Sequence, residues 1–192
     1  LLRHRLPIHL GGLSDPFSSL EHIKRTMQIV SILIDYDYPL IISSKQTQKI
    51  IRDDVLSILK KMKYISLQVS VPIPDNTLSK IIEPGAPIFS DRINQIKFLV
   101  KEGFHVVARI QPIIPPLINE IYTLAIPALR EAGCNHVIME CLKIPVERSE
   151  LFKSLFQTIK WDGYEYYLKR RAMLVGRDKV LPPIVALEQV RI

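Results

Sequence analysis

Short apolar runs that end in polar residues recur along this chain of 192 residues. They begin near positions 7, 39, 64, 104 and 135, roughly 25 to 40 residues apart. This spacing is typical of βα units, in which a helix connects each parallel strand to the next. The runs are nearly continuous in Ile, Leu and Val, which predicts strands with both faces covered. The pattern therefore indicates an α/β fold with five parallel strands.

The segments between these runs have the 3.6-residue periodicity of amphipathic helices. The apolar positions that share one helix face in the four segments are Ile23, Met27, Val30 and Ile34; Ile51, Val55, Ile58 and Met62; Ile93, Ile96 and Val100; and Ile121, Ala125 and Leu129. Ser90 is the expected N-cap of the third helix, and Gly103 is expected to end it. Pro127 lies inside the fourth segment, where it is expected to kink or restart the helix.

Alternating βα units form either a barrel or a doubly wound sheet. Polar residues at several successive strand ends favour a barrel, complete or incomplete, because its strand ends surround one shared site. The alternation stops after position 145, so we predict a barrel core at residues 1–145 and a helical extension at residues 146–192. The extension carries an aromatic and basic stretch: Trp161, Tyr164, Tyr166, Tyr167, Lys169, Arg170 and Arg171.

The charge balance favours anionic partners. Lys and Arg number 26 against 19 Asp and Glu, a net charge of +7 that suits phosphates or nucleic acid and also serves solubility. Two cysteines, Cys134 and Cys141, are too few for a disulfide scaffold and predict a reducing cytoplasm. No apolar run is long enough for a membrane span, and neither the cysteines nor the five histidines have metal-site spacing.

Three polar residues near the first two predicted strand ends are candidates for ligand binding. Lys45 follows two serines, where it could meet a carboxylate or phosphate, form a Schiff base, or remain a solvated loop lysine. Ser14 and Asp15 could bind an ammonium group or cap the helix that follows.

Three further charged residues lie beyond the third predicted strand. Glu83 and Arg92 are separated by a loop with prolines, and they could form an ion pair that pins this loop or could contact a ligand. Arg109 interrupts an apolar strand, where a charge must be paired or face a polar cavity. Arg109 is therefore predicted to belong to a site.

Several motifs, taken in order, resemble those of radical S-adenosylmethionine proteins, and most of all the spore photoproduct lyase-like (DNA-repair-photolyase-like) subgroup. The matching stretches are His9-Leu10-Gly11-Gly12-Leu13-Ser14-Asp15-Pro16-Phe17 with Glu21, Ile42-Ser43-Ser44-Lys45, Ile51-Arg52-Asp53 with Leu56, Val69-Ser70-Val71, Glu83-Pro84 with Pro87 and Arg92, and Arg109-Ile110 with Pro112-Ile113-Ile114-Pro115 and Asn119. The resemblance covers about residues 7–145, and Pro116 stands where the last motif expects glycine.

The resemblance implies a partial (β/α)6 TIM-like barrel that holds a [4Fe–4S] cluster and S-adenosylmethionine, with its first strand missing from this chain. In such enzymes the reduced cluster cleaves S-adenosylmethionine to methionine and a 5′-deoxyadenosyl radical, which abstracts hydrogen from the substrate. The subgroup implies a nucleic-acid lesion as substrate and a reductant such as flavodoxin or ferredoxin.

Carried over residue by residue, the resemblance implies a set of cofactor-binding residues and names no catalytic residue. Gly11, Gly12, Ser14 and Asp15 would hold the methionine amino group, Ser44 and Lys45 its carboxylate, Ser70 or Arg92 the ribose, and Pro112 and Ile113 the adenine, with Glu83 and Arg109 completing the set.

The defining Cys-x3-Cys-x2-Cys loop of the family is absent from this sequence. Three thiolates are needed to ligate three irons of the cluster, and we expect them before Leu1. Two other functions stay open. One is a Schiff-base barrel lyase with Lys45 as nucleophile. The other is a module without catalysis that binds nucleic acid or a partner through its basic surface and aromatic stretch.

Overall fold

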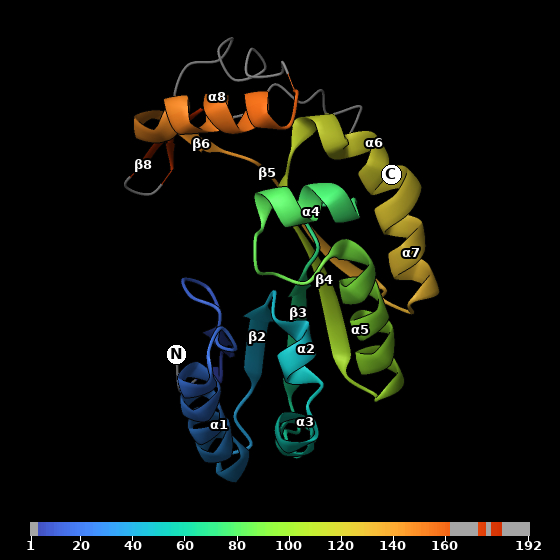
Figure 1. Cartoon of the computed structure of the whole chain (residues 1–192). Coiled ribbons are helices and arrows are strands. Elements are labelled where there is room, and N and C mark those ends of the chain that lie inside the picture. The colour runs from blue at the N-terminus through green and yellow to red at the C-terminus, as the bar shows by residue number, and fades with distance from the viewer. Residues whose placement is uncertain (1–3, 162–172, 176–177, 182–192) are drawn as a thin grey trace.

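A computed structural model describes residues 4–161, 173–175 and 178–181 of the chain. Its main element is a five-stranded parallel sheet in which each strand pairs with the next one along the chain (Figure 1). The strands are β1 (Ile8–Leu10), β2 (Leu40–Ser44), β3 (Ile65–Ser70), β4 (His105–Ile113) and β5 (His136–Cys141). A doubly wound sheet would reverse its strand order, so the order β1-β2-β3-β4-β5 confirms the barrel type. The barrel is not closed, because β1 and β5 do not pair.

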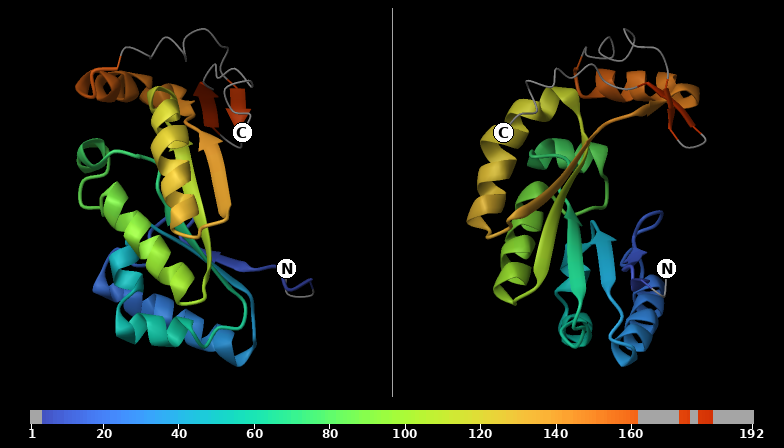
Figure 2. Two further views of the ribbon diagram at one scale, coloured as in Figure 1. Left: turned by 90° about the vertical axis from the view of Figure 1, so that its right-hand side faces the viewer. Right: turned by 180° about the vertical axis from the view of Figure 1, so that it is seen from behind.

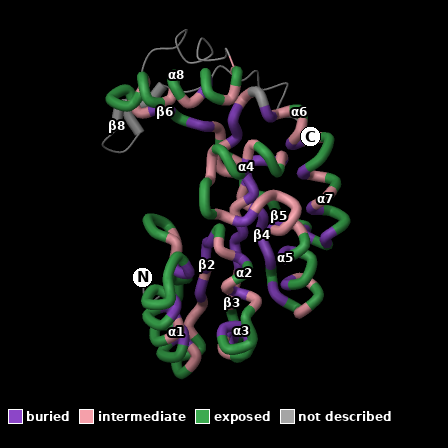
Figure 3. Tube along the Cα trace, viewed as in Figure 1, coloured by how far each residue is buried: buried purple, intermediate pink, exposed green. Residues whose placement is uncertain are grey.

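Helices connect the strands and lie on one side of the sheet (Figure 2). They are α1 (Leu20–Asp35), α2 (Thr47–Ile50), α3 (Asp53–Leu59), α4 (Asn76–Ile82), α5 (Phe89–Lys101), the 3₁₀ turn η2 (Pro115–Leu117), α6 (Ile118–Glu120), the π-helical turn η3 (Ile121–Ala125) and α7 (Ile126–Glu131). Buried residues follow the strands and the helix faces turned toward them (Figure 3).

The two faces of the sheet carry different kinds of side chain at the centre of the sheet. Strand register places Ile42 beside Leu67, and Leu67 beside Val106, on the face that packs against the helices. On the other face Ser43 lies beside Gln68. Side chains alternate between the two faces along a strand, so Ser43, Gln68 and Arg109 share this second face with Val107. We call this face, which lies opposite the helices, the open face.

Two helix details differ from expectation. Helix α5 begins at Phe89 with Ile88 as its N-cap, and the Asn76 side chain accepts a hydrogen bond from the Ser90 backbone N–H. Ser90 is therefore not the cap, because a residue of the preceding helix satisfies this end. Pro127 was expected to kink or restart the helix; the structure instead changes helix type there, because the π-helical turn η3 ends at Ala125 and Pro127 lies in the first turn of α7, which follows directly.

The C-terminal segment contains strands as well as the expected helix. It consists of β6 (Ile144–Pro145), the 3₁₀ turn η4 (Val146–Arg148), α8 (Ser149–Thr158), β7 (Met173–Val175) and β8 (Asp178–Leu181), and its three strands form an antiparallel sheet in the order β6-β8-β7. Tyr164, Tyr166, Tyr167 and Lys169 to Arg171 lie outside the described residues.

Helix α8 lies near the carboxyl ends of the strands (Figure 1). Its Phe156 is buried in an apolar cluster with Ile73, Ile114 and Leu142, which follow β3, β4 and β5 respectively. This cluster joins residues from both sides of position 145.

Candidate functional site

A pocket of about 380 Å³ lies where β1 to β4 end. It is lined by Gly11, Gly12, Leu13, Ser14, Asp15, Ser43, Ser44, Lys45, Ser70 and Arg109. All of these except Leu13 and Ser43 are site residues predicted from the sequence. Four strand ends that are far apart in sequence thus contribute to one concave surface, as parallel strands require.

The two glycines after β1 have different roles. Gly11 has a φ of +101°, and a Cβ atom built on it would lie 2.0 Å from the Ser43 carbonyl oxygen. A Cβ on Gly12 would meet nothing within 4 Å. Gly11 is therefore the residue that lets the chain turn against β2.

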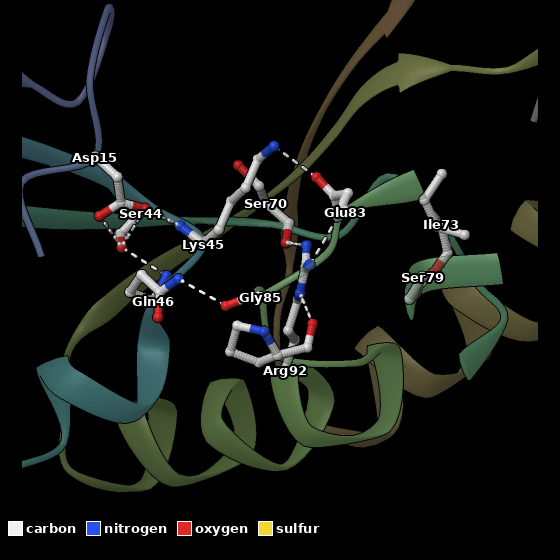
Figure 4. A network of polar contacts seen from close by, with 11 residues as sticks. Asp15, Ser44, Lys45, Gln46, Ser70, Ile73, Ser79, Glu83, Gly85 and Arg92 are labelled. Carbon is white, nitrogen blue, oxygen red and sulfur yellow. Dashed lines mark hydrogen bonds and ion pairs between the residues drawn. The ribbon is translucent and has the colours of Figure 1, made fainter. Parts of the chain in front are cut away.

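The Asp15 carboxylate ties the loop after β1 to the end of β2 (Figure 4). Its Oδ1 accepts hydrogen bonds from the Phe17 backbone N–H at 2.9 Å and from Ser44 Oγ at 2.8 Å, and its Oδ2 accepts one from the Lys45 backbone N–H at 2.7 Å. The alternative that Ser14 or Asp15 caps the next helix is wrong, because Ser19 is the N-cap of α1.

Glu83 bridges two cations at the edge of the pocket (Figure 4). Its Oε1 lies 2.6 Å from Lys45 Nζ, and its Oε2 lies 2.7 Å from Arg92 Nη2. The predicted ion pair between Glu83 and Arg92 is thus present. The Lys45 side chain is 48% exposed, whereas those of Glu83 and Arg92 are 8% and 2% exposed.

All three nitrogens of the Arg92 guanidinium bond to protein atoms. Besides the Glu83 contact, Nε donates to the Pro87 carbonyl at 2.6 Å and Nη1 to the Ser70 carbonyl at 2.7 Å. Arg92 therefore fixes the segment after β3 and does not line the pocket. Pro112 and Ile113 also lie outside the lining, and Ile113 is buried in the main core.

A polar network crosses the open face beside the pocket. Ser43 Oγ donates to Gln68 Oε1 at 2.9 Å, accepts from Arg109 Nη1 at 2.9 Å, and lies 2.6 Å from His9 Nε2. A hydroxyl has one proton to donate, and Ser43 gives it to Gln68. His9 Nε2 must then be the donor to Ser43, which leaves His9 Nδ1 as an acceptor.

The network continues to β5. Arg109 Nε donates to Gln111 Oε1 at 2.7 Å, and Gln111 Nε2 donates to Glu140 Oε2 at 3.1 Å. Sequence reasoning missed Ser43 and these glutamines. Polar residues at alternate positions of a strand, such as Arg109 and Gln111, were the available signal.

The surroundings of His9 are expected to make the stability of the fold depend on pH. Partial burial, and next to it the Arg109 charge, lowers the pKa of His9 below its usual range. Between the unfolded value of about 6.5 and this lower pKa, the unfolded chain binds more protons than the folded one. The contribution of His9 to stability is therefore present above about pH 6.5 and is lost as the pH falls.

We expect His9→Gln, which keeps a donor for Ser43, to reduce the loss of stability on acidification. Urea unfolding of wild type and variant at pH 7.5 and at pH 5.5 measures this, with His22→Gln as the control on the exposed end of α1. An equal loss in wild type and His9→Gln would contradict the assignment.

The described residues do not fit an iron–sulfur cluster. They contain no group of three or more His, Cys, Asp or Glu side chains that could hold a metal ion. Burial raises the pKa of both the Cys134 and Cys141 thiols, whereas a metal ligand must be a thiolate.

Among the described residues, none of the helices combines the length and the apolar character that crossing a bilayer requires.

Comparison with known sequences gives one distant relative. No model of a known protein family matches the chain. An uncharacterized protein of Methanocaldococcus jannaschii, MJ0683, is 29% identical over 177 residues, which is 92% of this chain and 65% of that protein. The chain thus spans somewhat less than two thirds of this relative.

Solved structures share the fold at low sequence identity. Spore photoproduct lyase complexed with a dinucleoside spore photoproduct matches with a TM-score of 0.68 and 14% identity, over 92% of this chain and 52% of that one. Streptococcus suis SuiB matches with a TM-score of 0.50 and 14% identity in its complex with S-adenosylmethionine, over 77% of this chain and 34% of that one. SuiB bound to its precursor peptide SuiA matches with a TM-score of 0.52.

Proposed function

We propose that the pocket binds S-adenosylmethionine and that the chain is the S-adenosylmethionine-binding part of a radical S-adenosylmethionine enzyme. The observation that carries this proposal is the convergence of Gly11, Asp15, Ser44 and Lys45 on one pocket. The motifs resembling the family assign these residues to the amino-acid end of the cofactor. The shared fold of spore photoproduct lyase and SuiB, both radical S-adenosylmethionine enzymes, supports it.

The charges of the pocket suit a zwitterionic amino acid. The Asp15 carboxylate accepts the ligand ammonium group, and the glycines beside it leave backbone groups accessible. The Lys45 ammonium has three N–H donors, and its half-exposed side chain leaves donors for a carboxylate besides the one directed at Glu83. Glu83 thus holds Lys45 at the rim of the pocket.

The radical reaction requires a cluster that this chain does not ligate by itself. A [4Fe–4S] cluster would supply the electron for this chemistry and would need three thiolates. The proposal therefore requires cysteines that the present sequence does not contain. A nucleic-acid lesion as substrate is part of the proposal, consistent with the net charge of +7.

The environment of Lys45 argues against the Schiff-base alternative. A nucleophilic lysine must be neutral, and the Glu83 carboxylate at 2.6 Å stabilises the charged ammonium. The alternative of a module without catalysis depends on the basic surface and the aromatic stretch. Of that stretch only Trp161 lies within the described residues, and its ring packs against Phe156.

We expect Lys45→Ala to weaken binding of S-adenosylhomocysteine by about tenfold to a hundredfold, because a charge-assisted hydrogen bond contributes about 1.5–3 kcal/mol. Isothermal titration measures the affinity. Lys61→Ala, at an exposed lysine beyond α3, is the matched control and should bind as wild type does. Equal affinity of wild type and Lys45→Ala would remove Lys45 from the ligand site.

A further inference from the structure

Two arginines near the pocket differ in what neutralises their charge. Arg92 is buried and ion-paired with Glu83, and each of its nitrogens has a protein acceptor. Arg109 makes no ion pair within the described part of the chain, and its hydrogen-bond acceptors are two neutral oxygens, Ser43 Oγ and Gln111 Oε1. The charge and all three nitrogens of Arg92 thus have partners within the protein, whereas the charge of Arg109 has no carboxylate partner among the described residues.

The Arg109 guanidinium has donors left for a ligand. A guanidinium carries five N–H donors, and Arg109 uses one on Nε and one on Nη1. Nη2 has no hydrogen-bond partner among the described residues. Arg109 is partly buried and lines the pocket. Withdrawing a charge from water without a counter-charge is costly, so its position favours an anion in the pocket.

The other charged groups around the pocket have contacts of their own. Lys45 faces the Glu83 carboxylate, and Asp15 accepts hydrogen bonds from Ser44, Phe17 and the Lys45 backbone. Among these contacts, no hydrogen bond or ion pair joins Lys45 or Asp15 to the Arg109 guanidinium. Of the three cations Lys45, Arg92 and Arg109, Arg109 is the one without a carboxylate partner among the described residues.

We infer that Arg109 binds an oxyanion of the substrate, a carboxylate or a phosphate, at the side of the pocket formed by the open face. This inference rests on the proposed function, because it assigns the rest of the pocket to S-adenosylmethionine. The planar guanidinium matches both oxyanions through paired N–H donors. Its contacts to Ser43 and Gln111 hold the guanidinium in place before the ligand arrives.

Lys45 and Arg109 are held in place by different segments of the chain. Lys45 follows β2 and is held by Glu83, from the segment between α4 and α5. Arg109 belongs to β4 and is held on the open face by Ser43 and Gln111. Two cationic groups with different supports suit two anionic groups on two ligands.

The test titrates wild type, Arg109→Gln and Lys45→Ala with inorganic phosphate, with acetate and with S-adenosylhomocysteine. We expect Arg109→Gln to weaken binding of phosphate or acetate at least tenfold and to change S-adenosylhomocysteine affinity less than twofold. Lys45→Ala should show the reverse pattern. Arg109→Lys keeps the charge but not the planar fork, so it should bind the small anion with intermediate affinity.

The titrations include a control variant and a check that each protein is folded. Arg25→Gln removes one exposed positive charge on α1 and should leave all three affinities unchanged, and circular dichroism verifies that each variant folds. Loss of S-adenosylhomocysteine binding in Arg109→Gln would assign Arg109 to the cofactor carboxylate and overturn the inference. Anion binding that is absent from wild type, or unchanged in Arg109→Gln, would overturn it as well. Failure of the Lys45 arm alone would contradict only the proposed function.

Discussion

A Gly11→Ala variant is expected to lose about 3 kcal/mol or more of its free energy of unfolding, a large share of the stability of a domain. The new Cβ would lie 2.0 Å from the Ser43 carbonyl oxygen, and the φ of +101° is one that L side chains rarely adopt. The obstacle is backbone, so it cannot rotate away, and β1 must separate from β2 to accommodate the methyl group. Urea unfolding of the purified variant measures the loss.

Gly12→Ala is the matched control. It adds the same methyl group one residue later, where a Cβ meets nothing within 4 Å. We expect its free energy of unfolding to stay within about 0.5 kcal/mol of wild type. Similar losses in both variants would mean that the loop, and not the contact with Ser43, limits stability.

Arg92→Met is expected to cost about 3–5 kcal/mol of folding free energy, because it removes one partner of a buried ion pair. The change leaves Glu83 with Lys45 alone and leaves the Ser70 and Pro87 carbonyls without their donor. A buried carbonyl without a partner is itself destabilising. Chemical unfolding followed by circular dichroism measures the effect.

Two further variants serve as comparisons for Arg92→Met: the partial rescue Arg92→Lys and the exposed control Arg25→Met. Lysine restores the charge but cannot reach three acceptors through a planar fork, so it should recover only part of the loss. Arg25 forms an exposed pair with Glu21, and its replacement should cost about 0.5 kcal/mol or less. A loss in Arg92→Met as small as that in Arg25→Met would show that the loop does not depend on this ion pair.

The strands and their order were predictable because apolar runs and helical periods are local signals. All five predicted strands of the sheet are present, and Pro127 acts where its missing N–H and ring dictate. The start of α5 was not predictable in this way, since its cap comes from Asn76 in another helix. The antiparallel sheet after position 145 depends likewise on pairing between segments that have no local signature.

The site was predicted in part for a similar reason. Gly11, Asp15, Lys45 and Arg109 line one pocket because strand ends of a parallel sheet meet at one edge. The inward orientation of Arg92 depends on three acceptors from separate segments, and sequence spacing does not encode them. The network through Ser43 was missed because it depends on Gln68 and Arg109 from two other strands, which sequence spacing does not encode.

The two faces of the sheet place residues of different kinds at alternate positions of a strand. On β4, Val106, Ala108 and Ile110 are buried in the main core, whereas Arg109 and Gln111 between and beyond them belong to the polar network. Substitutions at the second kind of position leave the packed layer intact, because neighbouring residues point to opposite faces. Ligand preference can therefore diverge among related sequences at alternate residues while the scaffold stays constant. A designer wishing to alter the substrate would vary the same alternate positions.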